Sequence, residues 1–553
     1  MNAAVSHRAR RIRPCERGVM LGTAASITQG SAGLALGYAA VAAPMLVGMI
    51  RGSASWKRLI AAPLYAVPVT LVAGAGLAAA SSLGASVSIA AGAVATVGLG
   101  YVSGRILARS ADAATEHRRG TRVLEQAQHR YERARSRHSA PERTAGISIA
   151  GIPIAEADET KHFKIIGTTG TGKSTAITEI LTAALARGDR AVIADPDGGY
   201  RRRFFDARRG DVILNPFESG SRKWDLFGEI RTPYDIEQLA RSLIPDHEGS
   251  DRSWRGYART FFTAVTRRAH EAGVKDVGEL HRLLVTAEPK ELRVLLAGTA
   301  AQPFLDEHNT RMFDSIRSVT SSAVTALEYV AEQRQQNLSV RDWVGGGDDG
   351  RDPRGVLFIP YQAGQIAALR SQISAWMRLS IFEAMNQPKP DRRLWFVVDE
   401  LDAVGQIDGL KDALARLRKF NGRCVLGFQS VAQVSSTYGN GDAHTLVENC
   451  ANSLILRSSA SEGGGTARFA SGLIGEREIL RTTHSRSRRP LDLVGVRTTS
   501  QQVTVEPAIL PSQIEQLPDL TGYLKVASRP EWLRVHLTPE REAVAAREAG
   551  YEV

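Results

Sequence analysis

The segment GTTGTGKS at residues 167–174 constrains the fold more than any other feature of this sequence. It follows HFKIIG (162–167), which predicts a short β-strand, and it precedes TAITEILTAALARG (175–188), which predicts a helix that ends at Gly188. The segment matches GxxxxGK(S/T) completely and stands between a strand and a helix, as in phosphate-binding loops of α/β proteins. The alternative is a glycine-rich turn that holds an incidental lysine.

Each residue type in this loop has a chemical reason. Glycines at three positions let backbone N–H groups turn inward around phosphates, and the positive end of the following helix favours the same anion. Lys173 is expected to reach the β- and γ-phosphates, and Ser174 to offer its hydroxyl to Mg²⁺. The predicted nucleotide-binding residues are Gly167, Thr168, Thr169, Gly170, Thr171, Gly172, Lys173, Ser174 and Thr175.

Acidic and amide side chains follow later strands. LWFVVDE (394–400) predicts a strand that ends in Asp399 and Glu400. Asp399 is expected to hold Mg²⁺ through water and Glu400 to polarise the attacking water, although an acid pair at a strand end is also common in helix-capping turns. Gln429 ends another apolar strand and suits sensing of the γ-phosphate or its water. Asp195, the last residue of AVIAD (191–195), is interpreted as a strand-end turn or a secondary contact.

The excess of positive over negative charge is confined to the start of the chain. Residues 1–144 carry 18 Lys and Arg against 6 Asp and Glu, so they account for the whole formal net charge of +12. These basic residues flank two runs without charge, Gly18–Ile50 with 33 residues and Leu59–Gly104 with 46 residues. A membrane-spanning helix needs about 20 apolar residues. We therefore expect a membrane anchor over 1–104; a cleavable signal peptide is the alternative for the first run.

The number of membrane crossings follows from the flanking charge. Basic residues on both sides of the anchor predict two cytoplasmic ends, and so an even number of crossings. We expect two crossings, with an apolar segment near 60–80 partly buried or re-entrant; whether the second run holds one helix or two is left open. The Arg/Glu-rich stretch 105–144 is predicted to be a solvated juxtamembrane helix and linker.

The sequence resembles the TraD/TrwB-type coupling proteins of type IV secretion and conjugation, which are related to the FtsK/HerA DNA-pumping ATPases. Most of the segments that carry the resemblance are not generic nucleotide-site patterns, and the TraD branch is the most similar. They are IPIAEADETKHFKIIGTTGTGKS (152–174), DVILNPFESGSRKWDLF (211–227), NLSVRDW (337–343), LWFVVDELDAVGQIDGL (394–410), ARLRKFNGRCVLGFQSVAQV (415–434), FASGLIGEREIL (469–480) and LPDLTGYLKV (517–526).

The resemblance implies an α/β fold: a RecA-like P-loop motor domain with an inserted all-α domain and an N-terminal transmembrane helical region. It implies ATP and Mg²⁺ as cofactors, a homo-hexameric ring with ATP between subunits, and DNA in the channel. It places Arg418 as an arginine finger supplied to the neighbouring subunit, with Arg457 as a second candidate. The expected organisation is a membrane anchor over 1–104, a linker over 105–144, the motor domain over 145–230 and 341–553, and the all-α domain over 231–340.

The expected function is that of a multi-pass inner-membrane ATPase with a cytoplasmic motor domain, which recruits a relaxase–DNA complex and pumps DNA into a type IV secretion channel. The DNA is expected to be single-stranded during transfer. RRRFF (201–205) is the candidate for part of a basic strip that contacts DNA. Two alternatives are kept: a motor of the same build that recruits only effector proteins, and a nucleotide-gated docking platform that does not pump. An FtsK-type chromosome motor is less favoured, because no basic winged-helix-like module follows the motor.

Overall fold

The structure is a computed structural model that describes residues 35–51, 56–82, 89–109, 115–126, 146–246, 252–346, 355–387, 393–460, 464–487 and 496–539. The chain forms two compact units. The larger unit comprises Arg119–Glu478 and Val505–Val553, and the smaller unit comprises Met1–Arg118 and Ile479–Thr504. Each unit is described separately below.

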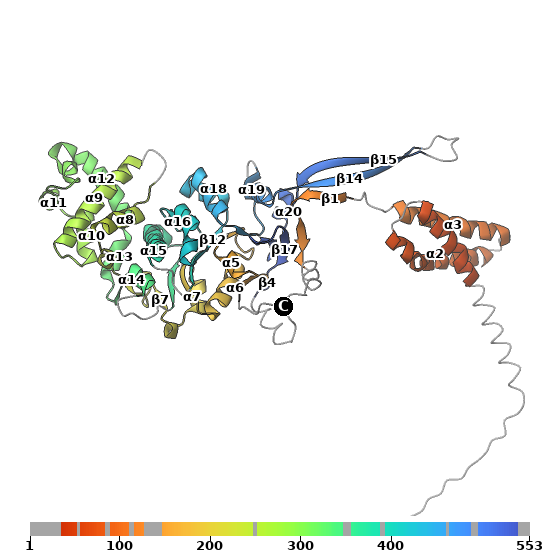
Figure 1. Ribbon diagram of the computed structural model, residues 1–553, viewed down its shortest axis with the longest axis horizontal. Coiled ribbons are helices and arrows are strands. Elements are labelled where there is room, and N and C mark those ends of the chain that lie inside the picture. Colours follow the sequence, from red (N-terminus) through yellow and green to blue (C-terminus); the bar gives the residue numbers. More distant parts are fainter. Residues whose placement is uncertain are drawn as a thin grey trace, which may run out of the picture. The chain divides into compact units, whose positions relative to one another are not determined.

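A ten-stranded sheet is the centre of the larger unit (Figure 1). Its strands lie in the order β2-β17-β16-β13-β5-β12-β11-β6-β10-β7. In that order they are β2 (Val123–Glu125), β17 (Trp532–His536), β16 (Thr521–Lys525), β13 (Asn452–Ile455), β5 (Phe163–Ile166), β12 (Gly422–Phe428), β11 (Leu394–Val398), β6 (Arg190–Pro196), β10 (Val356–Tyr361) and β7 (Val212–Ile213).

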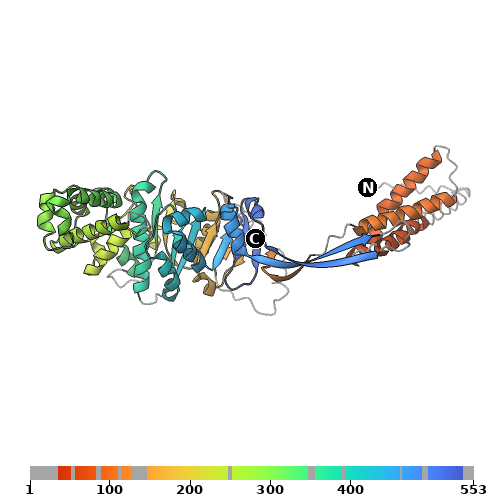
Figure 2. The ribbon, with the colours of Figure 1, turned by 90° about the horizontal axis from the view of Figure 1, so that it is seen from above.

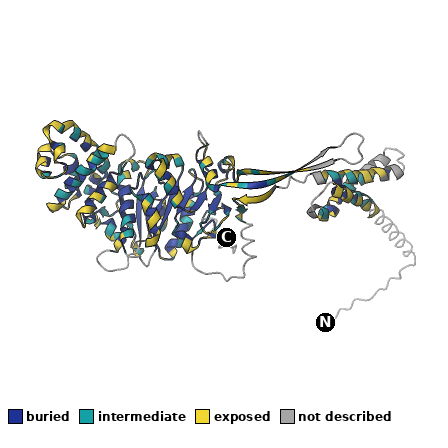
Figure 3. Cartoon of the chain, turned by 45° about the horizontal axis from the view of Figure 1, so that its top comes forward, coloured by how far each residue is buried: buried dark blue, intermediate teal, exposed yellow. Residues whose placement is uncertain are grey.

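The seven strands from β13 to β7 are all parallel. Parallel strands need crossover connections, which are usually helices that cover both faces of the sheet. This explains why these strands are almost uninterrupted apolar runs, with every residue of β5, β11 and β12 buried (Figure 3). At the other edge, β16 pairs antiparallel with β13 and with β17.

Helices cover the two faces of this sheet. α6 (Lys173–Ala186) packs Ile177 and Leu181 on the face formed by residues such as Val397 and Val425. The opposite face is covered mainly by helices that follow β10 in the chain and bury residues against the sheet. These are α15 (Ile366–Asn386), α16 (Leu410–Leu417), α17 (Val431–Tyr438), α18 (Asn440–Asn449), α19 (Gly465–Ile474) and α20 (Pro511–Glu515).

A group of helices lies beside the sheet, in yellow-green to green in Figure 1. It consists of α8 (Pro233–Leu243), α9 (Arg252–Glu271), α10 (Val277–Val285), α11 (Pro289–Leu295), α12 (Thr310–Val324) and α13 (Ala326–Glu332). Phe261 of α9 packs edge-on against Phe313 of α12, with ring centroids 5.4 Å apart. These helices lie within the predicted all-α range 231–340. The predicted domain boundaries themselves stay a prediction, because one compact unit contains both the helices and the sheet.

The remaining short elements of the larger unit connect these layers. The short helices are α5 (Glu156–Glu159), α7 (Gly199–Phe204), α14 (Val340–Gly345) and the 3₁₀ turn η5 (Arg418–Phe420). The short strands form two pairs, β3 (Ser148–Ile149) with β4 (Ile152–Pro153) and β8 (Lys223–Trp224) with β9 (Asn337–Leu338).

A second sheet has the order β1-β14-β15. β1 is Thr115–Gly120, and the twelve-residue strands β14 (Glu476–Ser487) and β15 (Val496–Pro507) run side by side as a long ribbon (Figure 2). β1 and β2 lie in the range 105–144, where a juxtamembrane helix was expected. That expectation is wrong for residues 115–125, which form strands.

The smaller unit contains a helix over 35–51, α2 (Trp56–Ser82) and α3 (Ile89–Arg109). The helix over 35–51 and α3 approach closely at glycines. A Cβ atom added to Gly104 would lie 2.1 Å from the carbonyl oxygen of Met45, and one added to Gly100 would lie 2.6 Å from that of Val41. Small residues therefore allow backbone contact between these two helices.

No helix in the described part of the chain is both long enough and apolar enough to cross a lipid bilayer. This finding contradicts the predicted multi-pass location in the inner membrane. The predicted anchor domain over 1–104, of which residues 1–34 lie outside the described part, stays a prediction. The multi-pass prediction counted residues without charge, but 12 of the 27 residues of α2 are Ala, Gly or Ser, the helix contains Pro63 and Pro68, and its first turn contains Lys57 and Arg58. The first part of the run Gly18–Ile50 lies outside the described residues.

Candidate functional site

The predicted site residues lie at the carboxyl ends of three neighbouring strands. β12 pairs with β5 so that Phe428 is opposite Ile166, and β11 pairs with β12 so that Val398 is opposite Leu426. The loop after β5, the acid pair after β11 and Gln429 after β12 therefore meet at one edge of the sheet. In open parallel sheets this edge is where ligands bind.

The loop 167–174 has the backbone of an anion cradle. Gly170 and Gly172 have φ angles of 77° and 112°, in the left-handed region that favours glycine. A Cβ atom at Gly172 would also lie 2.9 Å from Leu520 Cδ2. The loop is also fixed to the segment that follows β13, because Thr168 N donates to the carbonyl oxygen of Arg457 at 2.9 Å. α6 begins at Lys173, so the positive end of its dipole faces the loop.

Lys173 and Ser174 point to different partners. Lys173 Nζ donates to the carbonyl oxygens of Gly167 at 2.9 Å and Thr168 at 3.3 Å, and burial lowers the pKa of its amine. Ser174 Oγ donates to Asp399 Oδ2 at 2.8 Å. The structure thus brings together the lysine, the serine and the aspartate that the sequence predicted as one site.

Glu400 and Gln429 form a second hydrogen-bonded chain. Gln429 Nε2 donates to Glu400 Oε1 at 3.2 Å, and Thr169 Oγ1 donates to Gln429 Oε1 at 3.2 Å. Burial, together with the charge of Asp399, raises the pKa of the Glu400 carboxyl. A carboxylate with a raised pKa is better suited to accept a proton near neutral pH.

These residues fit a nucleotide with Mg²⁺. The other carboxylate oxygen of Asp399, Oδ1, is buried and has no hydrogen-bond partner among the described residues. A buried carboxylate oxygen without a partner is costly, and a hard cation or its water would satisfy it. The space around Gly170 is open, since nothing lies within 4 Å of a Cβ atom added there.

Tyr200 belongs to this cluster although the sequence analysis missed it. It is 4% exposed, and its hydroxyl donates to Asp399 Oδ2 at 2.8 Å. Burial, with the charge of Asp399, raises the pKa of the Tyr200 hydroxyl well above its usual value, so it stays a donor. The sequence held only a partial signal, because Tyr200 follows the strand AVIAD and its turn. Its approach to Asp399 depends on the pairing of β6 with β11, which the structure shows.

Asp195 lies at the end of β6, where a strand-end turn was expected. Its Oδ1 and Oδ2 atoms accept hydrogen bonds from the backbone N–H groups of Tyr200 at 3.0 Å and Arg201 at 2.7 Å. Burial raises the pKa of this fully buried carboxyl to about 6, although the backbone donors oppose the shift. Asp195 thus fixes the start of α7.

Arg418 lies far from this site within one subunit. It is exposed in η5, directly before β12, whereas the phosphate-binding loop contacts the far end of the same strand at Phe428. A seven-residue strand separates the two by about 20 Å. The turn is anchored because Arg423, fully buried, donates to the carbonyl oxygen of Asn421 at 2.7 Å and to Glu159 at 2.7 Å.

The other basic candidates are nearer to the loop. The carbonyl oxygen of Arg457 bonds Thr168, and its guanidinium pairs with Asp519 at 2.7 Å. In the segment 201–205, Arg201 pairs with Glu218 at 2.9 Å and Arg202 donates to the carbonyl oxygen of Asp197. Arg202 and Arg203 are exposed on α7. Their contact with DNA stays a prediction.

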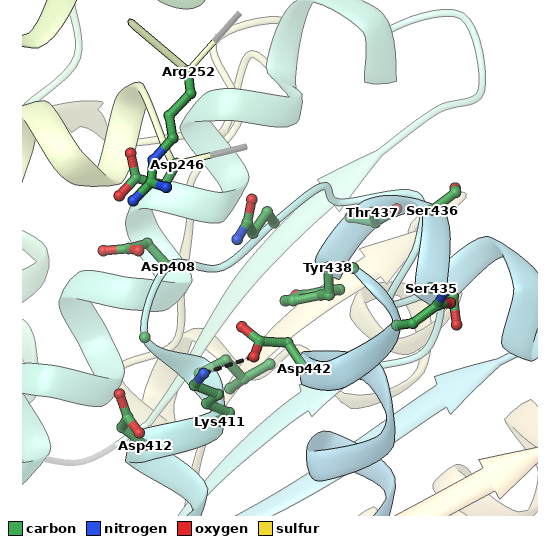
Figure 4. A pocket seen from close by; sticks show the side chains of 15 residues that line it. Asp246, Arg252, Asp408, Lys411, Asp412, Ser435, Ser436, Thr437, Tyr438 and Asp442 are labelled. Atoms are coloured by element: carbon green, nitrogen blue, oxygen red, sulfur yellow. Dashed lines mark hydrogen bonds and ion pairs between the residues drawn. The ribbon is translucent and has the colours of Figure 1, made fainter. Parts of the chain in front are cut away.

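A cavity of about 580 Å³ lies elsewhere in the larger unit (Figure 4). It is lined by the loop and first turn 406–412, the segment 435–440, and Asp246, Arg252 and Asp442. Lys411 pairs there with Asp442 at 2.6 Å. No residue of the phosphate-binding loop lines this cavity, so it is separate from the nucleotide site.

A family model for the type IV secretion-system coupling protein DNA-binding domain matches residues 146–538, which hold the whole sheet from β5 onward, the helices beside it and all of the site residues. The chain belongs to the type IV secretion-system coupling proteins. The resemblance predicted from the sequence is confirmed, and so is the α/β fold with a large parallel sheet.

Known members of the coupling protein family are similar over most of this chain. The coupling protein TraD of Escherichia coli (strain K12) is 31% identical over 429 residues, which is 73% of this chain and 59% of TraD. The chain thus spans about three fifths of the length of that relative. The plasmid coupling protein TrwB was solved with the ATP analogue ADPNP, and its structure has a TM-score of 0.66 at 29% identity, over 77% of this chain and 94% of that one. TrwB with ADP and Mg²⁺ has a TM-score of 0.65 at 30% identity, over 76% of this chain and 94% of that one.

Proposed function

We propose that this coupling protein is an ATP-hydrolysing motor that moves DNA toward a type IV secretion channel during conjugation. The observation that carries the proposal is that the predicted phosphate, metal and water-activating residues lie together at one sheet edge, with Ser174 bonded to Asp399 and Gln429 bonded to Glu400. A protein that binds nucleotide only as a switch, without hydrolysing it, has less need of Glu400 as a proton acceptor and of the Gln429 amide beside the phosphate-binding loop.

The roles proposed for these residues follow from their chemistry. Lys173 and the loop N–H groups bind the phosphates, and Ser174 and Asp399 would hold the Mg²⁺ ion. Mg²⁺ supplied with ATP neutralises part of the charge on the β- and γ-phosphates. Glu400 accepts the proton of the attacking water, and the amide of Gln429 orients that water. TrwB structures with ADPNP and with ADP and Mg²⁺ support the choice of ATP and Mg²⁺.

We infer that the active assembly is a homo-hexameric ring with ATP between subunits. The exposure of Arg418 at the sheet edge opposite its own phosphate-binding loop supports a role at the site of a neighbouring copy. A guanidinium beside the γ-phosphate would neutralise charge that develops there, an effect worth about 10³–10⁵ in rate in other nucleotide hydrolases.

The proposed substrate is DNA, single-stranded during transfer, delivered by a relaxase. The match to a domain model named for DNA binding and the likeness to TraD and TrwB support this substrate class. Exposed Arg202 and Arg203 on α7 are the proposed phosphate contacts. The alternatives are a motor that recruits only effector proteins and a docking platform that does not pump.

The experiment that tests the proposal is the ATP hydrolysis rate of the full chain with and without single-stranded and double-stranded DNA. We expect DNA to raise the rate severalfold, and Lys173→Ala to abolish hydrolysis under all conditions. The exposed variant Lys419→Ala, on the same chain, controls for loss of one surface lysine. A rate that DNA leaves unchanged would favour the effector-protein alternative, and wild-type protein without hydrolysis would favour the docking platform.

A further inference from the structure

The Asp399 carboxylate is held from one side only. Its Oδ2 atom accepts two hydrogen bonds, from Ser174 Oγ at 2.8 Å and from the Tyr200 hydroxyl at 2.8 Å. Its Oδ1 atom is buried and has no hydrogen-bond partner among the described residues. Two donors on one oxygen fix the plane of the carboxylate and leave the other oxygen for a ligand.

The two donors differ in their other tasks. In the proposed function the Ser174 hydroxyl would also hold Mg²⁺ through an oxygen lone pair, while its O–H can still donate to Asp399. Tyr200 has no such second task, and its hydroxyl is the other donor to Oδ2. The orientation of Asp399 therefore depends on Tyr200 as well as on Ser174.

Tyr200 is held rigidly for this purpose. It lies 4% exposed at the start of α7, and two N–H groups of the first turn, those of Tyr200 and Arg201, donate to the buried Asp195. β6, which contains Asp195 near its end, is paired with β11, which Asp399 follows, so the two carboxylates lie at the ends of adjacent parallel strands. The tyrosine therefore bridges from one strand end to the next.

We propose that Tyr200 is a positioning residue, whose hydroxyl orients the Asp399 carboxylate so that its free oxygen faces the Mg²⁺ that accompanies the nucleotide. This inference rests on the proposed function. The Tyr200 hydroxyl donates to the carboxylate of Asp399, so its loss is expected to alter metal use and not the affinity of the loop for the nucleotide itself.

The test is Mg²⁺-dependent binding of a fluorescent ADP analogue to the full chain, for wild type and Tyr200→Phe. We expect the Mg²⁺ concentration at half-maximal binding to rise about tenfold in Tyr200→Phe, as for loss of a hydrogen bond to a charged group. Binding in excess EDTA, which measures the loop without metal, is expected to be unchanged.

The matched control is Tyr361→Phe. Tyr361 ends the neighbouring strand β10 and is also 4% exposed, but its hydroxyl has no hydrogen-bond partner among the described residues. We expect this variant to keep the wild-type Mg²⁺ requirement. Equal shifts in both variants would overturn the positioning role, because they would reflect loss of any buried hydroxyl near the site.

A second variant, Asp195→Asn, tests the same role without removing the Tyr200 hydroxyl. It loses one of the two acceptors that fix the start of α7, so we expect a smaller rise in the Mg²⁺ concentration at half-maximal binding. An unchanged Mg²⁺ requirement in Tyr200→Phe would overturn the inference while the proposed function stood. Wild-type binding that ignores Mg²⁺ would instead contradict the proposed function.

Discussion

The Ser174 hydroxyl donates a 2.8 Å hydrogen bond to Asp399 Oδ2, although the two residues are 225 positions apart in the chain. The contact arises because Ser174 lies in the first turn of the helix after β5, Asp399 directly follows β11, and only β12 lies between those strands. The strand order of the sheet thus brings together the hydroxyl and the carboxylate of the proposed metal site.

Replacement of Asp399 tests this metal site. Asp399→Asn preserves the side-chain volume and can still accept from Ser174, but it removes the charge that would balance Mg²⁺. We expect nucleotide binding to become almost independent of Mg²⁺ and hydrolysis to fall by about 10²-fold or more. Calorimetric titration with ADP, with and without Mg²⁺, measures the first effect. Tight, fully Mg²⁺-dependent binding by the variant would refute the assignment.

Replacement of Glu400 separates binding from hydrolysis. Burial and Asp399 raise the pKa of Glu400, which suits a proton acceptor, and glutamine keeps the shape without that capacity. We expect Glu400→Gln to bind ATP with wild-type affinity and to hydrolyse it about 10²–10⁴-fold more slowly. Single-turnover hydrolysis of pre-bound ATP is the measurement. Asp412→Asn, on an exposed side chain in α16, is the control and should hydrolyse normally.

Arg418 is expected to act on a neighbouring subunit. In the Arg418→Ala variant by itself, the ATP hydrolysis rate should fall by about 10²-fold or more, while each subunit still binds nucleotide. The exposed Arg416→Ala, two residues away, is the control and should stay active.

Mixing decides whether Arg418 acts between subunits. Combining Arg418→Ala with Lys173→Ala protein should restore part of the activity, because some sites then pair an intact loop with an intact arginine. Hydrolysis that stays absent in every mixture, with mixed assembly shown by crosslinking, would contradict action between subunits.

The part of the site that one continuous segment forms could be predicted from the sequence. The loop 167–174 needs only its own glycines and its place between a strand and a helix. Asp399, Glu400 and Gln429 were also found, since side chains at the ends of parallel strands meet at one edge whatever the strand order. Their positions agree with the expected site, while their catalytic roles stay predictions.

Other features depend on information that lies outside any local pattern. Tyr200 reaches Asp399 only because β6 is the neighbour of β11, which no segment of sequence states. The membrane prediction is wrong because lack of charge is a weaker condition than apolarity: Ala, Gly and Ser add little apolar area to α2. The strands at 115–125 were missed because their Arg- and Glu-rich sequence favours a solvated helix.

His162 is expected to make stability depend on pH. It is buried between Cys424 N–H, which donates to Nδ1 at 3.2 Å, and the Leu414 carbonyl oxygen, 2.9 Å from Nε2. Burial lowers the pKa of His162 from 6.5 to about 4. The unfolded chain therefore binds a proton that the folded chain refuses, and stability is lost as the pH falls from about 6.5 toward 4.

The predicted loss in the free energy of unfolding is about 2 kcal/mol between pH 7 and pH 5. Urea unfolding of wild type and His162→Gln at several pH values measures it. The glutamine variant should lack this contribution, so the two pH profiles should converge at low pH. Parallel profiles would show that His162 titrates normally in the folded protein.

The central claim is that hydrolysis at the Lys173–Asp399–Glu400 site moves DNA. The most direct measurement is ATP-driven displacement of a triplex-forming third strand from a DNA duplex by the full chain, compared with Glu400→Gln. We predict displacement by the wild type only when ATP is hydrolysed, and DNA and ATP binding without displacement by Glu400→Gln. Wild-type protein whose hydrolysis responds to DNA but which displaces nothing, or displacement by Glu400→Gln, would contradict the claim.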